Sequence, residues 1–372
     1  MNSMISGRSR RLSMFWLLPC LIVFFARVPA QTSEPPLTSR EIVALVYELP
    51  KHPERHDEIV EMIRRRGIGF PLTDGMRSVV ATESGNDQVL RRTLEEAERR
   101  RLNPSASALP SEAEGNQLLE QTRTATLVAA DAMPDFLVKQ VIRRSAAFGT
   151  TNNWLPQDNL SIAVSYRASA GEEYKVLTVN GMPLGPQAKE GREYGDYVGG
   201  ASSTGEYVSG LASIFKTDSR TNFKLVDTDL LRGRRTLVYE FEIKHPYSSL
   251  SLKADHDSVT VGSRGRVWID REKDRVLRFE QIATEIAPGF PITAASSVID
   301  YDWVTINDQP YLLPIYADVF ITSAYRGQVI QKRNEIRFRG YQKYGAELKV
   351  IDEIDEKDFP PDPPEPPKPK KP

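Results

Sequence analysis

Two of the four histidines in the sequence, His52 and His56, are four residues apart, and Asp57 follows the second. On a helix this spacing would place both imidazoles on one face, where they could ligate a metal ion. Pro53 lies between them and predicts that the helix only begins there, because proline is tolerated in the first helical turn. No third ligand is evident in the sequence, so a solvated helix start explains the pair better than a metal site.

The other residues that could do chemistry are scattered. His256 lies between two aspartates in a segment with the composition of a polar loop. Glu240 and Glu242 would share the outward face of one strand, where carboxylates are normally solvated. No Gly-x-Ser-x-Gly, Gly-x-Gly-x-x-Gly or P-loop motif occurs. We therefore predict no catalytic, cofactor-binding or metal-binding residues, and a protein that is not an enzyme. A hydrolase with dispersed acidic residues stays an alternative, because paired carboxylates can be distant in sequence.

The charge balance argues against one class of partner. The 372 residues contain 49 Lys and Arg against 50 Asp and Glu, which gives a net charge of −1. Proteins that bind nucleic acids ordinarily carry a marked excess of basic residues, because they must neutralise phosphates. We therefore predict no nucleic-acid partner.

Residues 1–30 indicate a secretory signal peptide. They contain no acidic residue, carry three arginines near the start, continue in the apolar run 12–25 and reach Ala30 before polar residues follow. The run is too short to span a membrane, and no later segment approaches that length. We predict an extracytoplasmic protein, periplasmic or secreted, with no transmembrane segment after signal cleavage; retention of the signal as an anchor stays an alternative. The single cysteine, Cys20, lies within the run, so the rest of the chain has no disulfide.

Residues 38–102 have the pattern of a small all-helical domain. Thr38 and Glu41 fit a capping box, apolar residues recur at helical spacing in four segments, and Gly67 would end the second helix. Short helices joined by short loops usually form a compact bundle. Residues 103–117 are small and polar and predict a linker.

Residues 118–350 predict a helix followed by a long antiparallel sheet. The helix is expected over 118–147, with Phe136, Val141 and Ile142 on its apolar face. Further along, apolar and polar residues alternate in successive segments joined by short turns, which predicts a meander of roughly nine to eleven strands. A twisted sheet of that length tends to curl. The fold class is therefore α+β: a small N-terminal helical bundle, then a helix plus an antiparallel β-meander forming a curved half-barrel.

The C-terminal residues 351–372 differ in composition from the rest. Eight prolines fall within 360–372, among acidic and basic residues. Such a segment cannot form a core of its own and favours extended, polyproline-II-like conformations. We predict a disordered tail that is either solvated or in contact with a partner.

One stretch resembles a known family. Residues 223–243 are followed by the Val-Trp-Ile-Asp of 267–270, a polar turn, and the Val-Leu-Arg-Phe-Glu of 276–280. This order resembles the outer-membrane lipoprotein-sorting carriers and their relatives, which include periplasmic regulators of anti-sigma factors. The resemblance implies a helix and a half-open antiparallel β-barrel whose concave side accepts acyl chains. The helical unit and the proline-rich tail lie outside that plan, an arrangement that resembles uncharacterised exported bacterial proteins.

The favoured hypothesis is an exported, non-enzymatic binding protein that holds a lipid, an acyl chain or a lipoprotein in the half-barrel. The alternative is a structural or adaptor protein of the cell envelope with a solid-packed β-domain, which contacts an envelope protein through residues 38–102 or the proline-rich tail. If the half-barrel is hollow, the sequence offers five candidates for its lining, namely Phe136, Val141, Ile142, Trp268 and Phe279.

Overall fold

The computed structural model describes residues 34–104, 108–149, 153–183, 207–254, 257–325, 327–344 and 351–361. The predicted signal peptide lies outside these ranges. The chain from Pro36 onward forms one compact unit. Among the described residues, no helix combines the length and the apolar character that crossing a membrane requires.

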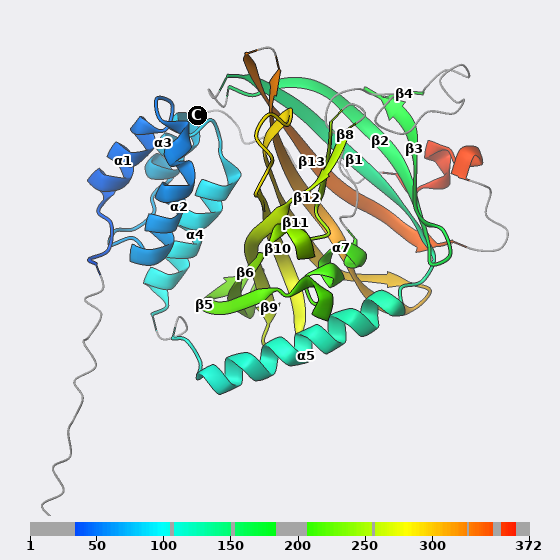
Figure 1. Cartoon of the computed structure of the whole chain (residues 1–372), viewed down its shortest axis with the longest axis horizontal. Coiled ribbons are helices and arrows are strands. Elements are labelled where there is room, and N and C mark those ends of the chain that lie inside the picture. Colours follow the sequence, from blue (N-terminus) through cyan, green and yellow to red (C-terminus); the bar gives the residue numbers. More distant parts are fainter. Residues whose placement is uncertain are drawn as a thin grey trace, which may run out of the picture. The chain divides into compact units, whose positions relative to one another are not determined.

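Residues 38–102 form four helices, as the sequence predicts, and a short 3-10 turn (Pro53–Arg55) leads into the second (Figure 1). Their bounds are α1 (Ser39–Glu48), α2 (His56–Arg66), α3 (Asp74–Glu83) and α4 (Gln88–Leu102). The capping box of α1 is present, because the Thr38 side chain accepts from the Glu41 amide while the Glu41 carboxylate accepts from Thr38. Gly67 ends α2 with φ +67, a conformation that glycine adopts without steric cost.

The four helices share an apolar core of their own. Its members include Ile42, Ile59, Ile63, Leu90 and Leu94, all at most 2 % exposed. These residues recur at helical spacing, so each helix presents one apolar stripe to the others. We call α1–α4 the bundle.

The next helix, α5 (Glu112–Asp131), begins inside the segment predicted as a linker. The predicted helix over 118–147 is wrong beyond Asp131, because Phe136–Phe148 form strand β1, which pairs with a strand on each side. Both faces of β1 are largely buried. Apolar residues therefore occur on consecutive positions, and the period-two signal that identifies a half-exposed strand is lost.

The sheet contains eleven antiparallel strands, in the order β4-β3-β2-β1-β13-β12-β11-β10-β9-β6-β5. Strands β7 and β8 form a separate hairpin. The bounds are β1 (Phe136–Phe148), β2 (Leu155–Arg167), β3 (Gly171–Val179), β4 (Met182–Pro183), β5 (Asn222–Leu231), β6 (Arg234–Ile243), β7 (Ser251–Ala254), β8 (Asp257–Thr260), β9 (Gly262–Asp270), β10 (Arg275–Thr284), β11 (Ile292–Ile306), β12 (Gln309–Tyr325) and β13 (Gln328–Lys343).

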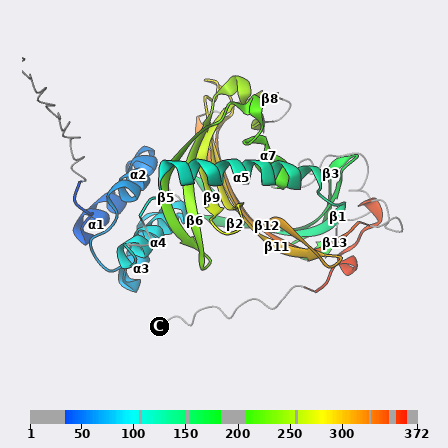
Figure 2. The same ribbon diagram turned by 90° about the horizontal axis from the view of Figure 1, so that it is seen from below.

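The sheet is curved but not closed, so β4 and β5 are its edges. Its chain order is a meander from β9 to β13, extended by β1–β4 on one side and by β6 and β5 on the other. Figure 2 shows the sheet curving around α5 and the short helix α7 (Val208–Ser213), which lie on its concave side. The predicted α+β half-barrel is confirmed.

The concave face carries the main apolar core. Side chains from α5, from α7 and its flanks, and from all the long strands contribute to one cluster. Phe136 stacks on Tyr166 with ring centroids 5.2 Å apart, and Tyr207 lies 5.3 Å from Phe136 on its other flank. Phe241 stacks on Phe279 at 5.5 Å. Protein side chains thus occupy this face.

The convex face is covered in part by the chain's own C-terminal segment. The prediction of a disordered tail from residue 351 is wrong for the described residues 351–361, which contain the 3-10 turns Ile351–Glu353 and Glu356–Asp358. Ile354 is completely buried against Leu137 and neighbouring side chains of β2 and β3. The apolar residues that precede the proline run bury their side chains against the sheet, and this burial offsets the entropy lost when the segment is ordered. They are Ile351, Ile354 and Phe359. The remainder of the predicted tail lies outside the described residues.

Candidate functional site: an arginine-lined pocket

The bundle contacts the convex face of the sheet through charged side chains. Helices α2 and α4 supply mostly arginines, and strands β5, β9 and β10 supply most of their partners. The cross-junction pairs include Arg64–Glu280 (2.9 Å), Arg99–Asp229 (2.8 Å), Arg264–Asp57 (3.2 Å), Arg266–Glu61 (3.3 Å) and Arg100–Asp227. Removing such charges from water is costly, so each of these groups requires a partner.

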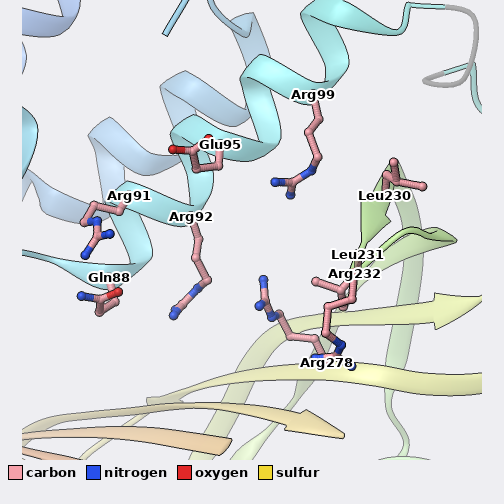
Figure 3. A pocket seen from close by; sticks show the side chains of 9 residues that line it. All are labelled: Gln88, Arg91, Arg92, Glu95, Arg99, Leu230, Leu231, Arg232 and Arg278. Carbon is pink, nitrogen blue, oxygen red and sulfur yellow. The ribbon is translucent and has the colours of Figure 1, made fainter. Parts of the chain in front are cut away.

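At one end of this junction, α4 and the strands enclose a pocket of about 220 Å³ (Figure 3). Five arginines and one carboxylate contribute to its wall. The lining residues are Gln88, Arg91, Arg92, Glu95 and Arg99 from α4, Leu230, Leu231 and Arg232 from the β5–β6 hairpin, and Arg278 from β10. Glu95 is engaged by Arg77 at 2.7 and 3.2 Å, so the charge of this carboxylate is balanced from outside the pocket.

Two of the arginines are fixed by bidentate bonds to carboxylates behind them. Arg99 donates from Nε and Nη2 to the two oxygens of Asp229, at 2.8 and 3.0 Å. Arg278 donates in the same way to Asp300, at 2.7 and 3.1 Å. A bidentate pair of this kind fixes the orientation of the guanidinium and is also stronger than a single hydrogen bond. Both cations are therefore held in place before any ligand arrives.

Arg232 reaches the pocket from a strained turn. It is the first residue of the two-residue loop between β5 and β6, and it has φ +50 beside Gly233 at φ +78. Two positive φ angles are typical of the type I′ hairpin, in which the first position is usually Asn, Asp or Gly. An arginine there carries a steric cost. Its Nη2 donates to the Tyr301 carbonyl at 2.5 Å, which anchors the side chain over β11.

Arg92 differs from its neighbours because its hydrogen-bonding capacity is unused. Its Nε and Nη2 are buried and have no hydrogen-bond partner among the described residues. The nearest carboxylate oxygen, Oε1 of Glu280, is 3.7 Å from Nε, which is an ion pair but too long for a hydrogen bond. The other oxygen of Glu280 accepts from Arg64 at 2.9 Å. Buried donors left unsatisfied are rare and costly, so Arg92 is the group in the pocket that most requires an acceptor.

Two buried glutamates behind the pocket have pKa values that are shifted in opposite directions. Burial raises the pKa of Glu96 to about 7, and the nearby Asp229 adds to this, while Arg64 opposes it. Burial would also raise the pKa of Glu280, but Arg64, Arg92 and Arg278 together hold it below its usual value. Glu280 is therefore the carboxylate that balances the arginines, and Glu96 is the group of the junction that titrates near neutrality.

This arrangement is suited to binding an anion. Guanidinium groups offer planar pairs of N–H donors that match carboxylate and phosphate oxygens, and their charge is permanent. The lining contains no hydroxyl, thiol or imidazole that could act as a nucleophile or base. Within the ranges that the structure describes, no three His, Cys, Asp or Glu side chains gather in a way that could hold a metal ion.

The two histidines considered as metal ligands are engaged separately. His52 lies 3.1 Å from Glu54, and His56 lies 3.0 Å from Asp57 and 3.2 Å from Asp87. Although burial lowers the pKa of His56, Asp87 and Asp57 raise it to about 10. A protonated imidazole has no lone pair for a metal, so His56 fixes the start of α4 instead.

The five predicted lining residues are divided between the two faces of the sheet. Phe136, Ile142 and Phe279 lie in the concave core. Val141 and Trp268 lie on the convex face, since side chains alternate along β1 and β9.

Trp268 supports the arginine pocket from behind. Its Nε1 donates to Asp229 at 3.1 Å, the same carboxylate that holds Arg99. The guanidinium of Arg278 lies 5.7 Å from its ring centroid, within cation–π range.

The arginines themselves were missed by sequence reasoning. Arg91, Arg92 and Arg99 lie among many charged residues of α4, where a charge run is usually a solvated face. The available signal was the β5–β6 hairpin, in which an arginine occupies a loop position that favours Asn, Asp or Gly. Its partnership with α4 depends on tertiary packing, which no local pattern encodes.

Comparison with known proteins gives weak structural likenesses only. No protein-family model and no curated protein sequence match the chain. A DUF1329 family protein from Desulfovibrio piger is similar over 62 % of this chain and 95 % of its own, with 9 % identity and a TM-score of 0.28. MucB in complex with MucA(peri) is similar over 59 % of this chain and 93 % of its own, with 12 % identity and a TM-score of 0.17. The MucA/MucB complex from Pseudomonas aeruginosa gives 10 % identity and a TM-score of 0.16 over 58 % of this chain and 93 % of that one. With TM-scores this low, we transfer no role from any of them.

Proposed function

We propose that this chain is an exported, non-enzymatic binding protein of the cell envelope, which captures an acidic group of its ligand in the arginine-lined pocket. The observation that carries the proposal is Arg92, a partly buried cation whose buried Nε and Nη2 donors have no hydrogen-bond partner among the described residues and which lines a cavity with four other arginines. An anion in the cavity would supply the missing acceptor once the Arg92 side chain turns these two nitrogens toward it, because they are buried in this conformation. Export rests on the signal-like residues 1–30.

The packing of the concave face favours this site over the half-barrel interior. Tyr207 and Phe215, which flank α7, are each 1 % exposed and fill the space beneath α5. An acyl chain would have to displace these side chains, which would lose their own apolar burial. The observed packing therefore supports the adaptor hypothesis, with a solid β-domain, more than lipid carriage.

The pocket is expected to bind with moderate affinity and marked salt dependence. Carboxylates behind the arginines offset part of the positive charge, and the pocket is open to solvent on one side, where ions screen it. A bidentate guanidinium–anion contact still contributes about 1.5–3 kcal/mol, as hydrogen bonds to charged groups do.

Calorimetric titration with inorganic phosphate and with N-acetylaspartate tests the proposal. The wild-type protein should bind at least one of them, and Arg92→Gln should weaken that affinity about tenfold or more, since one charge-assisted contact is worth this much. Arg40→Gln is the matched control, because it removes the same charge from an exposed position on α1. Equal affinities for Arg92→Gln and Arg40→Gln, or no binding by the wild type, would contradict the proposal.

A further inference from the structure

A second pocket adjoins the arginine-lined one. It has a volume of about 290 Å³ and lies between α3 and α4. Its lining consists of Leu72, Arg77, Ser78, Val80, Ala81, Asn86, Arg91, Leu94 and Glu95. Arg91 and Glu95 line both pockets. These two residues are one turn apart on α4, so they form the ridge on which the pockets meet.

The chemistry of the second pocket differs from that of the first. Its floor is apolar, since Leu72, Val80 and Leu94 belong to the buried core of the bundle. Its rim carries the polar side chains of Ser78 and Asn86. The ridge between the pockets is held in place, because Arg91 donates to Asn86 at 2.9 Å and Glu95 accepts from Arg77.

The two pockets together select for a ligand that is acidic at one point and apolar at the next. We infer that they bind one acidic peptide segment of a partner protein, with a carboxylate in the arginine-lined pocket and an aliphatic side chain in the second pocket. This inference rests on the proposed function, because it requires that the arginine-lined pocket binds an anion.

A peptide fits these pockets better than a lipid does. The second pocket is at the small end of ligand pockets, which ordinarily span roughly 300–1,000 Å³, and its closed floor suits a single branched side chain rather than a long acyl chain. The polar rim can pair with peptide N–H and C=O groups, which must be satisfied when they leave water. An acyl chain would leave that rim without partners.

The spacing predicts a simple sequence preference. Both pockets contact the same two residues, so a bound segment has to cross only one row of α4 side chains to reach from one pocket to the other. Along an extended peptide, side chains two residues apart lie on the same face and are roughly 6.6 Å apart. The preferred segment is therefore an acidic residue, any residue, then Leu, Ile or Val.

Calorimetric titration with two five-residue peptides tests the inference. Both are acetylated and amidated; one has the sequence Gly-Glu-Gly-Leu-Gly and the other has Gly in place of Leu. The leucine peptide should bind about tenfold more tightly, since burying a leucine side chain is worth that factor. Arg92→Gln should lower the affinity of both peptides by the same factor.

Two variants of α3 locate the leucine. Ser78→Phe places a ring over the second pocket from an exposed position, and it should abolish the preference for leucine, so that the two peptides bind this variant with equal affinity. Thr82→Phe adds the same ring at another exposed position of α3 outside the lining and should keep the preference.

The outcomes separate the two claims. Equal affinity of both peptides for the wild type, or a preference that survives in Ser78→Phe, overturns the peptide inference while anion binding that depends on Arg92 stands. The peptide inference is also overturned if phosphatidylglycerol vesicles bind in an Arg92-dependent manner while the leucine peptide binds no more tightly than the glycine peptide. If the wild-type protein binds none of the anions tested, phosphate included, the proposed function itself is overturned.

Discussion

The two faces of the same sheet are covered in different ways. The concave face meets α5 and α7 through an apolar core rich in aromatic rings. The convex face meets the bundle through pairs of arginines and carboxylates. Apolar burial is favourable whatever its detailed geometry, whereas buried charges cost free energy unless each is paired. The difference indicates that the concave face supplies stability, whereas the charged junction sets how the bundle docks on the sheet and carries the proposed ligand site.

The largest effect is expected in the concave core. Phe136→Ala removes a ring that contacts Tyr166, Tyr207 and Tyr341, and it should lower the free energy of unfolding by about 3–5 kcal/mol. Val141→Ala, on the convex face of the same strand, should cost about 1 kcal/mol, since the side chain is only half-buried. Urea denaturation measures both. Similar losses for the two variants would remove the distinction between the faces.

The next effect concerns the carboxylate that supports the pocket. Asp229→Asn deprives Arg99 of its charged partner and weakens the acceptor of Trp268, so stability should fall by about 1–3 kcal/mol. Anion affinity should fall as well, because the guanidinium of Arg99 loses its fixed orientation. Denaturation and calorimetry on one preparation would show both changes. A loss of stability with unchanged affinity would mean that Arg99 takes no part in binding.

A pH effect is expected from Glu96. Its pKa in the folded protein, about 7, lies above the usual value of 4.5, so the folded state binds the proton more tightly. The contribution of Glu96 to stability is therefore present at low pH and is lost as pH rises through about 7. Glu96→Gln should be more stable than the wild type at pH 8, by on the order of 1–3 kcal/mol, and indistinguishable from it near pH 4. Denaturation midpoints across that range measure the difference, and parallel pH profiles would show that folding does not raise the pKa of Glu96.

The smallest effect is expected at the rim of the junction. Arg264 and Asp57 are about half exposed and 3.2 Å apart. Arg264→Gln should change the free energy of unfolding by less than about 1 kcal/mol, because solvent screens such pairs. Thermal denaturation at low and high salt would detect it. A loss as large as that of Asp229→Asn would mean that the rim supports the junction as much as its centre does.

The sequence predicted the elements whose signals are local. The capping box at Thr38 and the glycine that ends α2 required no tertiary knowledge. The strands from β9 to β13 were predicted from alternating residues and from the short polar turns between them. Strand β1 was mistaken for a helix because both of its faces are largely buried, so that its apolar residues occur on consecutive positions. Residues 351–361 were assigned to the disordered tail because the following prolines dominated the composition.

The candidate site could not be predicted, for a physical reason. Arg92, Arg232 and Arg278 come from three distant parts of the chain, and each lies in a locally charged segment. Whether such a charge is solvated or buried depends on which face of the sheet meets the bundle. Whether the bundle also folds as an independent domain stays a prediction, as does signal cleavage.

The most direct test of the central claim is a crystal structure of the protein soaked with tungstate, an anion that can be located by its anomalous scattering. The account predicts a peak in the arginine-lined pocket, within hydrogen-bond distance of the Arg92 guanidinium, and its loss in Arg92→Gln. An empty pocket with tungstate bound elsewhere on the protein would contradict it.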